Sequence, residues 1–212
     1  PILALPHYSR RLDRHPLFWE LTPGFRSSYG PFLLSTYHWA PSTNLDIGMD
    51  LDGRQRRGVG GGPNVEYDLG KLGQGTGRFY YTRDDLPPVL PDGVLADSDR
   101  WRYDFHHSLT NQSGFSFQSV VHGQKDALVT HDFFESEFRR DTQPKTFIEA
   151  NQAWRNFTLD ALVQPQINDF FTTVERLPDV KFTGLRQQLG VTPVYYESET
   201  SLGYLRYRDA AI

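Results

Sequence analysis

Three histidines are the first residues in this sequence that could do chemistry, because imidazole is a common ligand of zinc and related metals. His106 and His107 are adjacent, and His122 follows them at a distance. Adjacent side chains on a strand point to opposite faces, so His106 and His107 cannot both reach one ion without a bulge. Asp104 could add an oxygen ligand, but it shares a face with His106 alone. The pattern predicts structural histidines and no metal site.

Two pairs of acidic residues, Asp84 with Asp85 and Glu135 with Glu137, raise the question of glycoside hydrolysis. That reaction needs two carboxyl groups that face each other across a cleft at a separation of about 5 to 9.5 Å. A chain with 26 acidic residues singles out no such pair. Positions in loops and on a solvated strand face explain these carboxylates, and we predict no catalytic residue and no enzymatic activity.

The glycine-rich run Gly58–Gly62 resembles a phosphate-binding loop only superficially. No Lys-Ser/Thr follows it, and no helix begins there to offer its N-terminus to a phosphate. Glycines in such a context more often mark a strand that bends sharply or that another backbone approaches closely. We predict such a strand and no nucleotide cofactor.

Arg54, Arg56 and Arg57 form a short basic cluster beside these glycines. A charged turn at the rim of a sheet explains the cluster. The guanidinium fork also matches phosphate oxygens, so the same residues are candidates for contact with phosphorylated glycolipid headgroups. Both interpretations could hold together at a membrane rim.

The elements that position these residues are predicted to be strands. Leu45, Ile47, Met49 and Leu51 alternate with Asp46, Gly48, Asp50 and Asp52. Side chains on a strand alternate between two faces, so one face of this segment is apolar and the other is acidic or bare. No window shows apolar residues at helical spacing, and we interpret even Ile148–Trp154 as a strand. Short turns between the segments predict an all-β antiparallel meander.

The predicted strands are Pro16–Arg26, Phe32–Trp39, Leu45–Arg54, Pro63–Leu69, Thr76–Thr82, Trp101–Leu109, Phe115–Val121, His131–Arg139, Thr146–Trp154, Phe157–Gln164, Pro178–Leu185 and Val191–Tyr207, the last with an optional break at Gly203. Asp84–Arg100 contains three prolines and several aspartates, so it is predicted to be a long loop on one rim. In outer-membrane barrels the long loops lie on the cell exterior.

The composition of the 212 residues narrows the classes of protein. Only 38% are hydrophobic while 14% are aromatic, which is typical of a transmembrane β-barrel with aromatic girdles. A net charge of -4 gives no basic footprint for nucleic acid. Cysteine is absent, and no run of about 18 apolar residues could form a membrane helix. The start at Pro1 without a leader indicates a processed protein or an excerpt.

Periodicity alone leaves open what the apolar faces contact, since a soluble β-sandwich alternates in the same way. One hypothesis is part of an outer-membrane β-barrel whose apolar faces meet lipid. The alternative is a soluble all-β carbohydrate-binding or glycan-processing domain that stacks sugars on Trp19, Trp39 or Trp101. A general porin-like channel is a third hypothesis.

The order of several short motifs resembles the start of the barrel of the LptD family, the outer-membrane lipopolysaccharide-assembly proteins also called organic solvent tolerance proteins. The motifs are Leu21-Thr22-Pro23-Gly24-Phe25, Tyr37-His38-Trp39-Ala40-Pro41-Ser42-Thr43-Asn44-Leu45-Asp46, Arg56-Arg57-Gly58, Val65-Glu66-Tyr67, Phe79-Tyr80-Tyr81, Arg83-Asp84-Asp85, Arg100-Trp101 and Arg176-Leu177-Pro178. The resemblance spans residues 16 to 185.

The resemblance implies a function and a location. Lipopolysaccharide would pass from a periplasmic bridge of LptA through a jelly-roll domain and leave sideways through the barrel into the outer leaflet of the cell outer membrane. Residues 1–12 would end the jelly roll, and residues 13–212 would form the amino-terminal part of the barrel. A proline that weakens the lateral gate would be Pro23, and Pro31 is the nearest counterpart of a second one.

The resemblance also implies that the lipoprotein LptE occupies the barrel lumen as a plug. Lumen-facing residues could then line the plug or the passage. Strand parity gives the candidates Asp46, Asp50, Arg102, Asp104 and Asp160.

Overall fold

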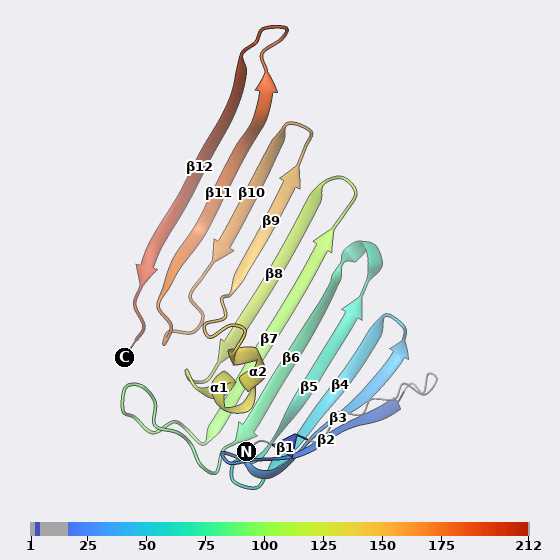
Figure 1. The fold of residues 1–212 in the computed structure, drawn as a ribbon, viewed down its shortest axis with the longest axis vertical. Helices are drawn as coiled ribbons and strands as arrows, with labels where there is room; N and C mark the ends of the chain where they lie inside the picture. The colour runs from blue at the N-terminus through green and yellow to red at the C-terminus, as the bar shows by residue number, and fades with distance from the viewer. Residues whose placement is uncertain (1–2, 5–16, 212) are drawn as a thin grey trace. The chain divides into compact units, whose positions relative to one another are not determined.

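The computed structural model describes Leu3–Ala4 and residues 17–211, and shows an all-β meander with one helical interruption (Figure 1). The strands are β1 (Leu3–Ala4), β2 (Leu17–Arg26), β3 (Gly30–Ser42), β4 (Leu45–Arg54), β5 (Gly58–Asp68), β6 (Gln74–Arg83), β7 (Asp99–Thr110), β8 (Phe115–Gln124), β9 (Phe147–Ala153), β10 (Phe157–Gln164), β11 (Thr173–Gln188) and β12 (Tyr195–Arg208). The helices are η1 (Gly70–Leu72), α1 (Val129–Phe133) and α2 (Glu135–Phe138). None of the helices in the described part is long and apolar enough to span a membrane.

The strands follow one another in one sheet in chain order, and the pairs from β1 to β5 and from β8 to β12 are antiparallel. The predicted antiparallel meander is therefore confirmed. Asp84–Arg100 is mostly a connection, as predicted, with a single bridge between Val89 and Leu95. The interpretation of Ile148–Trp154 as a strand is also confirmed, because β9 covers most of it.

The prediction of a strand over His131–Arg139 is wrong. This segment forms α1 and α2, two helices of five and four residues that meet at Phe134. They lie between β8 and β9, where the chain leaves the sheet. Helices this short give no helical period in the sequence, and their aromatic content favoured a strand.

The glycine-rich run is part of β5, and its backbone is closely approached, as predicted. A Cβ at Gly60 would lie 2.5 Å from the hydroxyl oxygen of Tyr80. Gly58 has a φ of 78° at the turn before β5, a conformation that side chains rarely adopt. A Cβ at Gly58 would collide with the carbonyl oxygen of Arg83, so the neighbouring strand would have to move, whereas a Cβ at Gly60 would displace the buried side chain of Tyr80.

The chain forms two compact units. The first contains residues 1–68, 76–104 and 123–142, and the second contains residues 69–75, 105–122 and 143–212. The first unit holds β1 to β5, most of β6, the first half of β7 and both α-helices. The second unit holds most of β8, the second half of β7 and β9 to β12.

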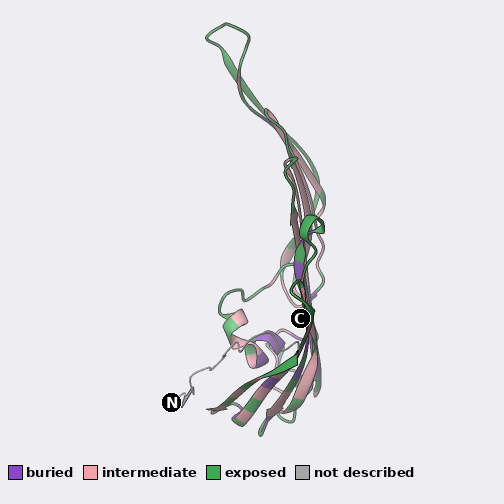
Figure 2. Ribbon diagram, turned by 90° about the vertical axis from the view of Figure 1, so that its right-hand side faces the viewer, coloured by how far each residue is buried: buried purple, intermediate pink, exposed green. Residues whose placement is uncertain are grey.

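In the first unit the usual polarity of a sheet is inverted. On β4, Met49 is 43% exposed and Leu51 is 51% exposed, while Asp50 between them is only 5% exposed. On β6, Phe79 and Tyr81 are exposed and Tyr80 and Thr82 are buried. The buried side chains of Tyr80, Arg54 and Arg100 contact Phe133 of α1. Figure 2 shows buried residues both on the helical segment and on the strands of this unit.

Within residues 17–211 the buried apolar side chains are Tyr29, Tyr80, Ala96, Val129 and Phe133. All five belong to the first unit. The alternating apolar residues that a soluble sandwich would bury are exposed instead. The described chain thus lacks the apolar second layer that a sandwich needs.

Candidate functional site

The candidate site is built around the segment between β8 and β9, residues 125–142, which we call the insert. Its start is ordered by Asp126, whose carboxylate accepts a hydrogen bond from the backbone N–H of Leu128 at 2.9 Å. Val129, Thr130 and Phe133 of α1 are buried. The insert packs on the polar face of the first unit, so this face is covered by protein.

Beneath the insert lies a group of five arginines, here called the arginine cluster. Its members are Arg54 of β4, Arg57 of the following turn, Arg78 of β6, and Arg100 and Arg102 of β7. Arg100 is 0% exposed and Arg102 is 2% exposed. Because a buried charge is costly unless it is paired, the partners of these guanidinium groups decide whether the site is stable.

Two phenylalanine rings of the insert reach into the arginine cluster. The guanidinium carbons of Arg54, Arg57 and Arg100 lie 5.0, 5.1 and 5.3 Å from the ring centre of Phe133. Arg102 lies 4.0 Å from the ring centre of Phe134. Contacts within about 6 Å of an aromatic face are attractive, and more so when water is excluded. The rings therefore bind the insert to the cluster.

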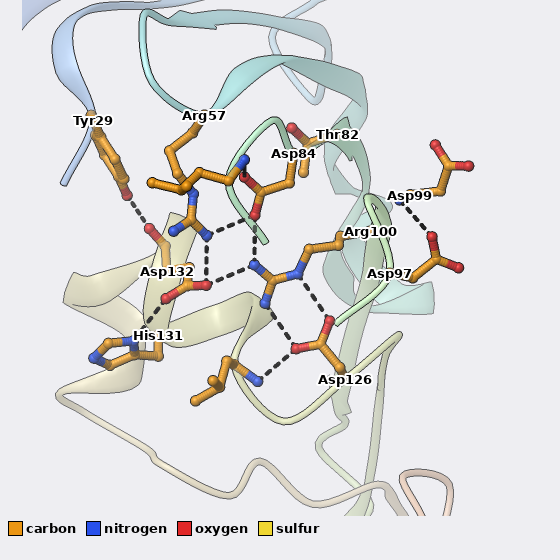
Figure 3. A network of polar contacts seen from close by, with 12 residues as sticks. Tyr29, Arg57, Thr82, Asp84, Asp97, Asp99, Arg100, Asp126, His131 and Asp132 are labelled. Carbon is orange, nitrogen blue, oxygen red and sulfur yellow. Dashed lines mark hydrogen bonds and ion pairs between the residues drawn. The ribbon is translucent and has the colours of Figure 1, made fainter. Parts of the chain in front are cut away.

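Carboxylates complete the pairing of the most buried arginine (Figure 3). Arg100 donates two hydrogen bonds to Asp126, at 2.8 and 2.9 Å, in a bidentate pair. Its Nη1 also donates to Asp84 at 2.9 Å and to Asp132 at 2.6 Å. Arg57 donates to the same two carboxylates at 2.7 and 2.6 Å. Bidentate and charge-assisted bonds of this kind are the strong ones, so Asp132 of the insert is firmly held.

The second half of the insert is held in the same way. Glu137 of α2 accepts hydrogen bonds from Arg102 at 2.5 Å and from Arg78 at 3.4 Å. Arg78 also pairs with Asp50 at 3.2 Å, and Arg102 pairs with Asp104. Strands β4, β6 and β7 are thereby connected to α2 through charged side chains.

The electrostatics at α1 favour the ionised form of its aspartate. Burial would raise the pKa of Asp132, but hydrogen bonds from Arg100 and His131 and the charge of Arg57 hold that pKa below its usual value. Asp132 therefore keeps its charge at neutral pH. The arrangement is suited to hold a segment in place rather than to transfer protons.

The site brings together some of the predicted lumen-facing residues. Asp50, Arg102 and Asp104 all lie in the network under α2. Asp46 pairs instead with His38, whose Nδ1 lies 3.0 Å away. Asp160 belongs to the second unit and is hydrogen bonded to Asn151. That all five face a lumen stays a prediction.

The three arginines predicted to contact headgroups have different surroundings. Arg54 is 3% exposed, and its guanidinium contacts Tyr80 and Asp52 at 2.7 and 3.0 Å. Arg57 is likewise engaged with the insert. Arg56 is exposed and donates to the carbonyl of Ser27 at 2.8 Å. The headgroup contact stays a prediction, and Arg56 is the member of the three whose side chain is open to solvent.

Both predicted gate prolines lie in the β2–β3 hairpin, where they affect different edges. The carbonyl of Pro31 accepts from the N–H of Gln55, so the backbone of Pro31 faces β4. In an antiparallel pair the N and O of one residue point to the same side. Pro31 is opposite Phe25 in the β2–β3 pair, so the backbone N and O of Phe25 point away from β3. The same holds for Pro23, which is two residues from Phe25. Pro23 thus removes a donor from the outer edge of β2, and Pro31 removes one from the β3–β4 ladder.

Sequence reasoning missed the residues that hold the insert, above all Asp126, Asp132, Phe133 and Phe134. One signal was present, because Glu135 and Arg139 have the i, i+4 spacing of a helical ion pair, and the two are indeed paired. The partners of the phenylalanine rings come from strands far away in the sequence. No local pattern points to them.

In comparisons with known proteins, the chain is similar to two curated proteins that carry the same name. The chain is 27% identical to "LPS-assembly protein LptD" of Cupriavidus necator over 219 aligned positions, which cover 98% of this chain and 25% of that protein. It is 25% identical to "LPS-assembly protein LptD" of Pseudoalteromonas translucida over 193 positions, which cover 86% of this chain and 24% of that protein. No family model matches the chain. The chain spans about a quarter of the length of the curated relatives that it matches, and its similarity to LptD is distant and partial.

Proposed function

We propose that this chain forms the amino-terminal part of an outer-membrane β-barrel that assembles lipopolysaccharide into the outer leaflet. In this proposal the exposed apolar faces of the strands contact lipid, and the polar face with the insert lines the lumen. The assignment of residues 1–12 to the end of a periplasmic jelly roll stays a prediction. Of these residues the structure describes Leu3–Ala4, which pair with Gly24 and Phe25 near the end of β2 that the orientation proposed below places outside the cell.

The inverted polarity of the strands carries the proposal. Met49 and Leu51 are about half exposed while Asp50 is buried under the insert, which is the arrangement expected of a barrel wall between lipid and a polar interior. The similarity to LptD over most of this chain supports the choice of lipopolysaccharide as cargo.

The proposed orientation is chosen so that the long connections lie outside the cell, as they do in outer-membrane barrels. If β2 starts from the periplasmic side, its end at Arg26 is on the exterior, together with the loop after β6 and the insert. The long connections then lie outside the cell, as in other barrels of this class. LptA would deliver the lipopolysaccharide from the periplasm, and LptE would lie in the lumen on the periplasmic side of the insert.

The membrane part of the proposal is tested with single cysteines, since the 212 residues contain none. Met49→Cys and Glu66→Cys place a nitroxide label on opposite faces of the neighbouring strands β4 and β5. In bilayers, we expect the label at Met49 to collide more with oxygen, which dissolves in lipid, and the label at Glu66 to collide more with an aqueous nickel chelate.

Equal exposure of both labels to the nickel chelate would refute the membrane part. A protein that stays in solution without detergent would favour the alternative, a soluble carbohydrate-binding domain. Trp19 and Trp39, at 54% and 48% exposure, would then be the sugar-stacking residues.

The lateral opening is tested by comparing the two prolines in the full-length protein. Pro23→Val returns an N–H to the outer edge of β2, whereas Pro31→Val returns one to the β3–β4 ladder. A ladder bond contributes about 1 kcal/mol, or about fivefold in an opening equilibrium. We expect Pro23→Val to slow lipopolysaccharide export and to raise sensitivity to detergents. The matched Pro31→Val should do neither to the same degree, and equal effects of the two changes would argue against an opening at the outer edge of β2.

A further inference from the structure

The exterior end of the β2–β3 hairpin is tied to the insert by two contacts that do not belong to the sheet. The hydroxyl of Tyr29, in the turn between β2 and β3, donates a hydrogen bond to the backbone carbonyl of Asp132. Arg26, the last residue of β2, pairs with Glu135 of α2 at 2.8 Å. Tyr29 is only 4% exposed, and burial raises the pKa of its hydroxyl, so it remains a donor at neutral pH. The hairpin tip is thus fixed by both a buried and a partly exposed contact.

Apart from these contacts, the hairpin is attached on its inner side to β4, through the ladder and through side-chain hydrogen bonds such as that from Thr36 to Asp50. The β3–β4 ladder lacks the N–H of Pro31, and its register is interrupted between Trp39 and Ser42. Within the described residues, the outer edge of β2 is paired only at Gly24 and Phe25, with Ala4 and Leu3. Because few residues pair with its outer edge, the hairpin can move more easily than an interior pair of strands.

The insert itself is anchored away from the hairpin. Asp132 is held by Arg57 and Arg100, and Glu137 is held by Arg102 of β7. The hairpin tip is therefore attached to a segment that charge pairs fix to β7 and to the β4–β5 turn, and the pairs of Asp132 are buried. The insert thus connects the tip of the β2–β3 hairpin to β4, β6 and β7 through side-chain contacts that do not belong to the sheet.

We propose that the insert is a latch that holds the exterior end of the β2–β3 hairpin against the sheet, and that release of Tyr29 and Arg26 from it precedes movement of the hairpin. The inference rests on the proposed function for its purpose, because a lateral opening at β2 requires this hairpin to yield. The contacts that form the latch exist whatever the cargo is. The insert stays docked on the arginine cluster while the hairpin moves.

The test is a charge exchange in the full-length protein, purified and placed in lipid nanodiscs. Arg26→Glu and Glu135→Arg each break the ion pair, and the double exchange restores it with reversed charges. We expect each single change to speed amide hydrogen exchange in β2 and β3 by about two- to fivefold, the effect of an ion pair at this exposure, and the double exchange to recover most of the loss. Tyr29→Phe, which keeps the ring and removes the hydroxyl, should speed exchange in the same strands.

Arg139→Ala is the matched control, since it removes the other partner of Glu135 and leaves Arg26 in place. It should leave exchange in β2 and β3 unchanged. If both single exchanges and Tyr29→Phe leave hairpin exchange unaltered, or if the double exchange recovers nothing, the latch is refuted.

A different measurement shows whether the proposed function is wrong. Hydrogen exchange in nanodiscs needs no lipopolysaccharide, so the latch can be measured independently of the cargo. Depletion of the protein from cells reports on the cargo, because an assembly protein should leave lipopolysaccharide out of the outer leaflet when it is lost. A responsive hairpin with normal lipopolysaccharide would support the latch and refute the function, and the reverse result would refute the latch alone.

Discussion

The two units of this chain differ in how far the polar side chains of their strands are exposed to solvent. In the first unit the polar face is covered by the insert, and Asp84, Arg100 and Thr82 are 1% exposed or less. In the second unit no insert covers the polar side chains of the described strands. Its ion pair between Lys181 and Glu199 has side chains that are 44% and 60% exposed, and among its described residues Glu175 is the one buried carboxylate, with arginine partners that are half exposed. The same strand pattern therefore gives a dry charge network in one unit and mostly hydrated charges in the other.

This difference distinguishes the interactions that form the strands from those that hold further segments against them. Among its described residues the second unit buries no apolar side chain, and every residue of β12 is exposed. Its order comes from ladder hydrogen bonds and cross-strand pairs. The first unit adds buried charges and aromatic rings, which specify one position for the insert. Such specificity is useful where a segment must hold a hairpin and release it.

Of the substitutions that test this difference, Arg100→Ala is expected to have the largest effect. The change leaves the carboxylates of Asp84, Asp126 and Asp132 without their shared partner in a site that excludes water. Breaking a buried charge network by removing one partner costs about 3 to 5 kcal/mol. We expect the free energy of unfolding of the first unit to fall by about this amount in chemical denaturation, and the insert to become accessible to proteases.

Arg100→Lys separates the contribution of the positive charge from that of the bidentate hydrogen bonds. Lysine keeps the charge but cannot form the two-pronged bond to Asp126, so it should recover only part of the loss. A protein with Arg100→Ala that unfolds like the parent would mean that the network is not held together by this guanidinium group.

Much of the fold could be predicted because strand alternation is a local property. The predicted Leu45–Arg54 matches β4 residue for residue, and Phe157–Gln164 matches β10. In both segments apolar and polar residues alternate over most of the length, with Leu162 as the exception in β10, and turn residues mark the ends. The sequence did not show which face would be buried, because the same alternation occurs whether the apolar side chains contact a protein core or lipid.

The site could be predicted only in part, because its partners are distant in the chain. Strand parity placed Asp50 and Arg102 on the polar face, where the structure has them in contact with the insert's charged network. The insert itself was predicted as a strand. Its two helices have no side-chain caps, and the contacts that stabilise Phe133 and Phe134 come from arginines on β4 to β7. Helices of this length depend on tertiary contacts, which a local pattern does not contain.

The smallest expected effect tests the open charges of the second unit. Lys181→Ala removes the partner of Glu199 and a positive charge near Asp160 and Asp179. The pair is exposed, and exposed ion pairs contribute only about 0 to 1 kcal/mol, which salt reduces further. We therefore expect no resolvable change in the unfolding midpoint at that salt concentration, and a slight destabilisation only in dilute buffer. A loss as large as that of Arg100→Ala would mean that this ion pair is shielded from solvent by a further segment or a partner. The contrast between the two units would then hold only for the residues described.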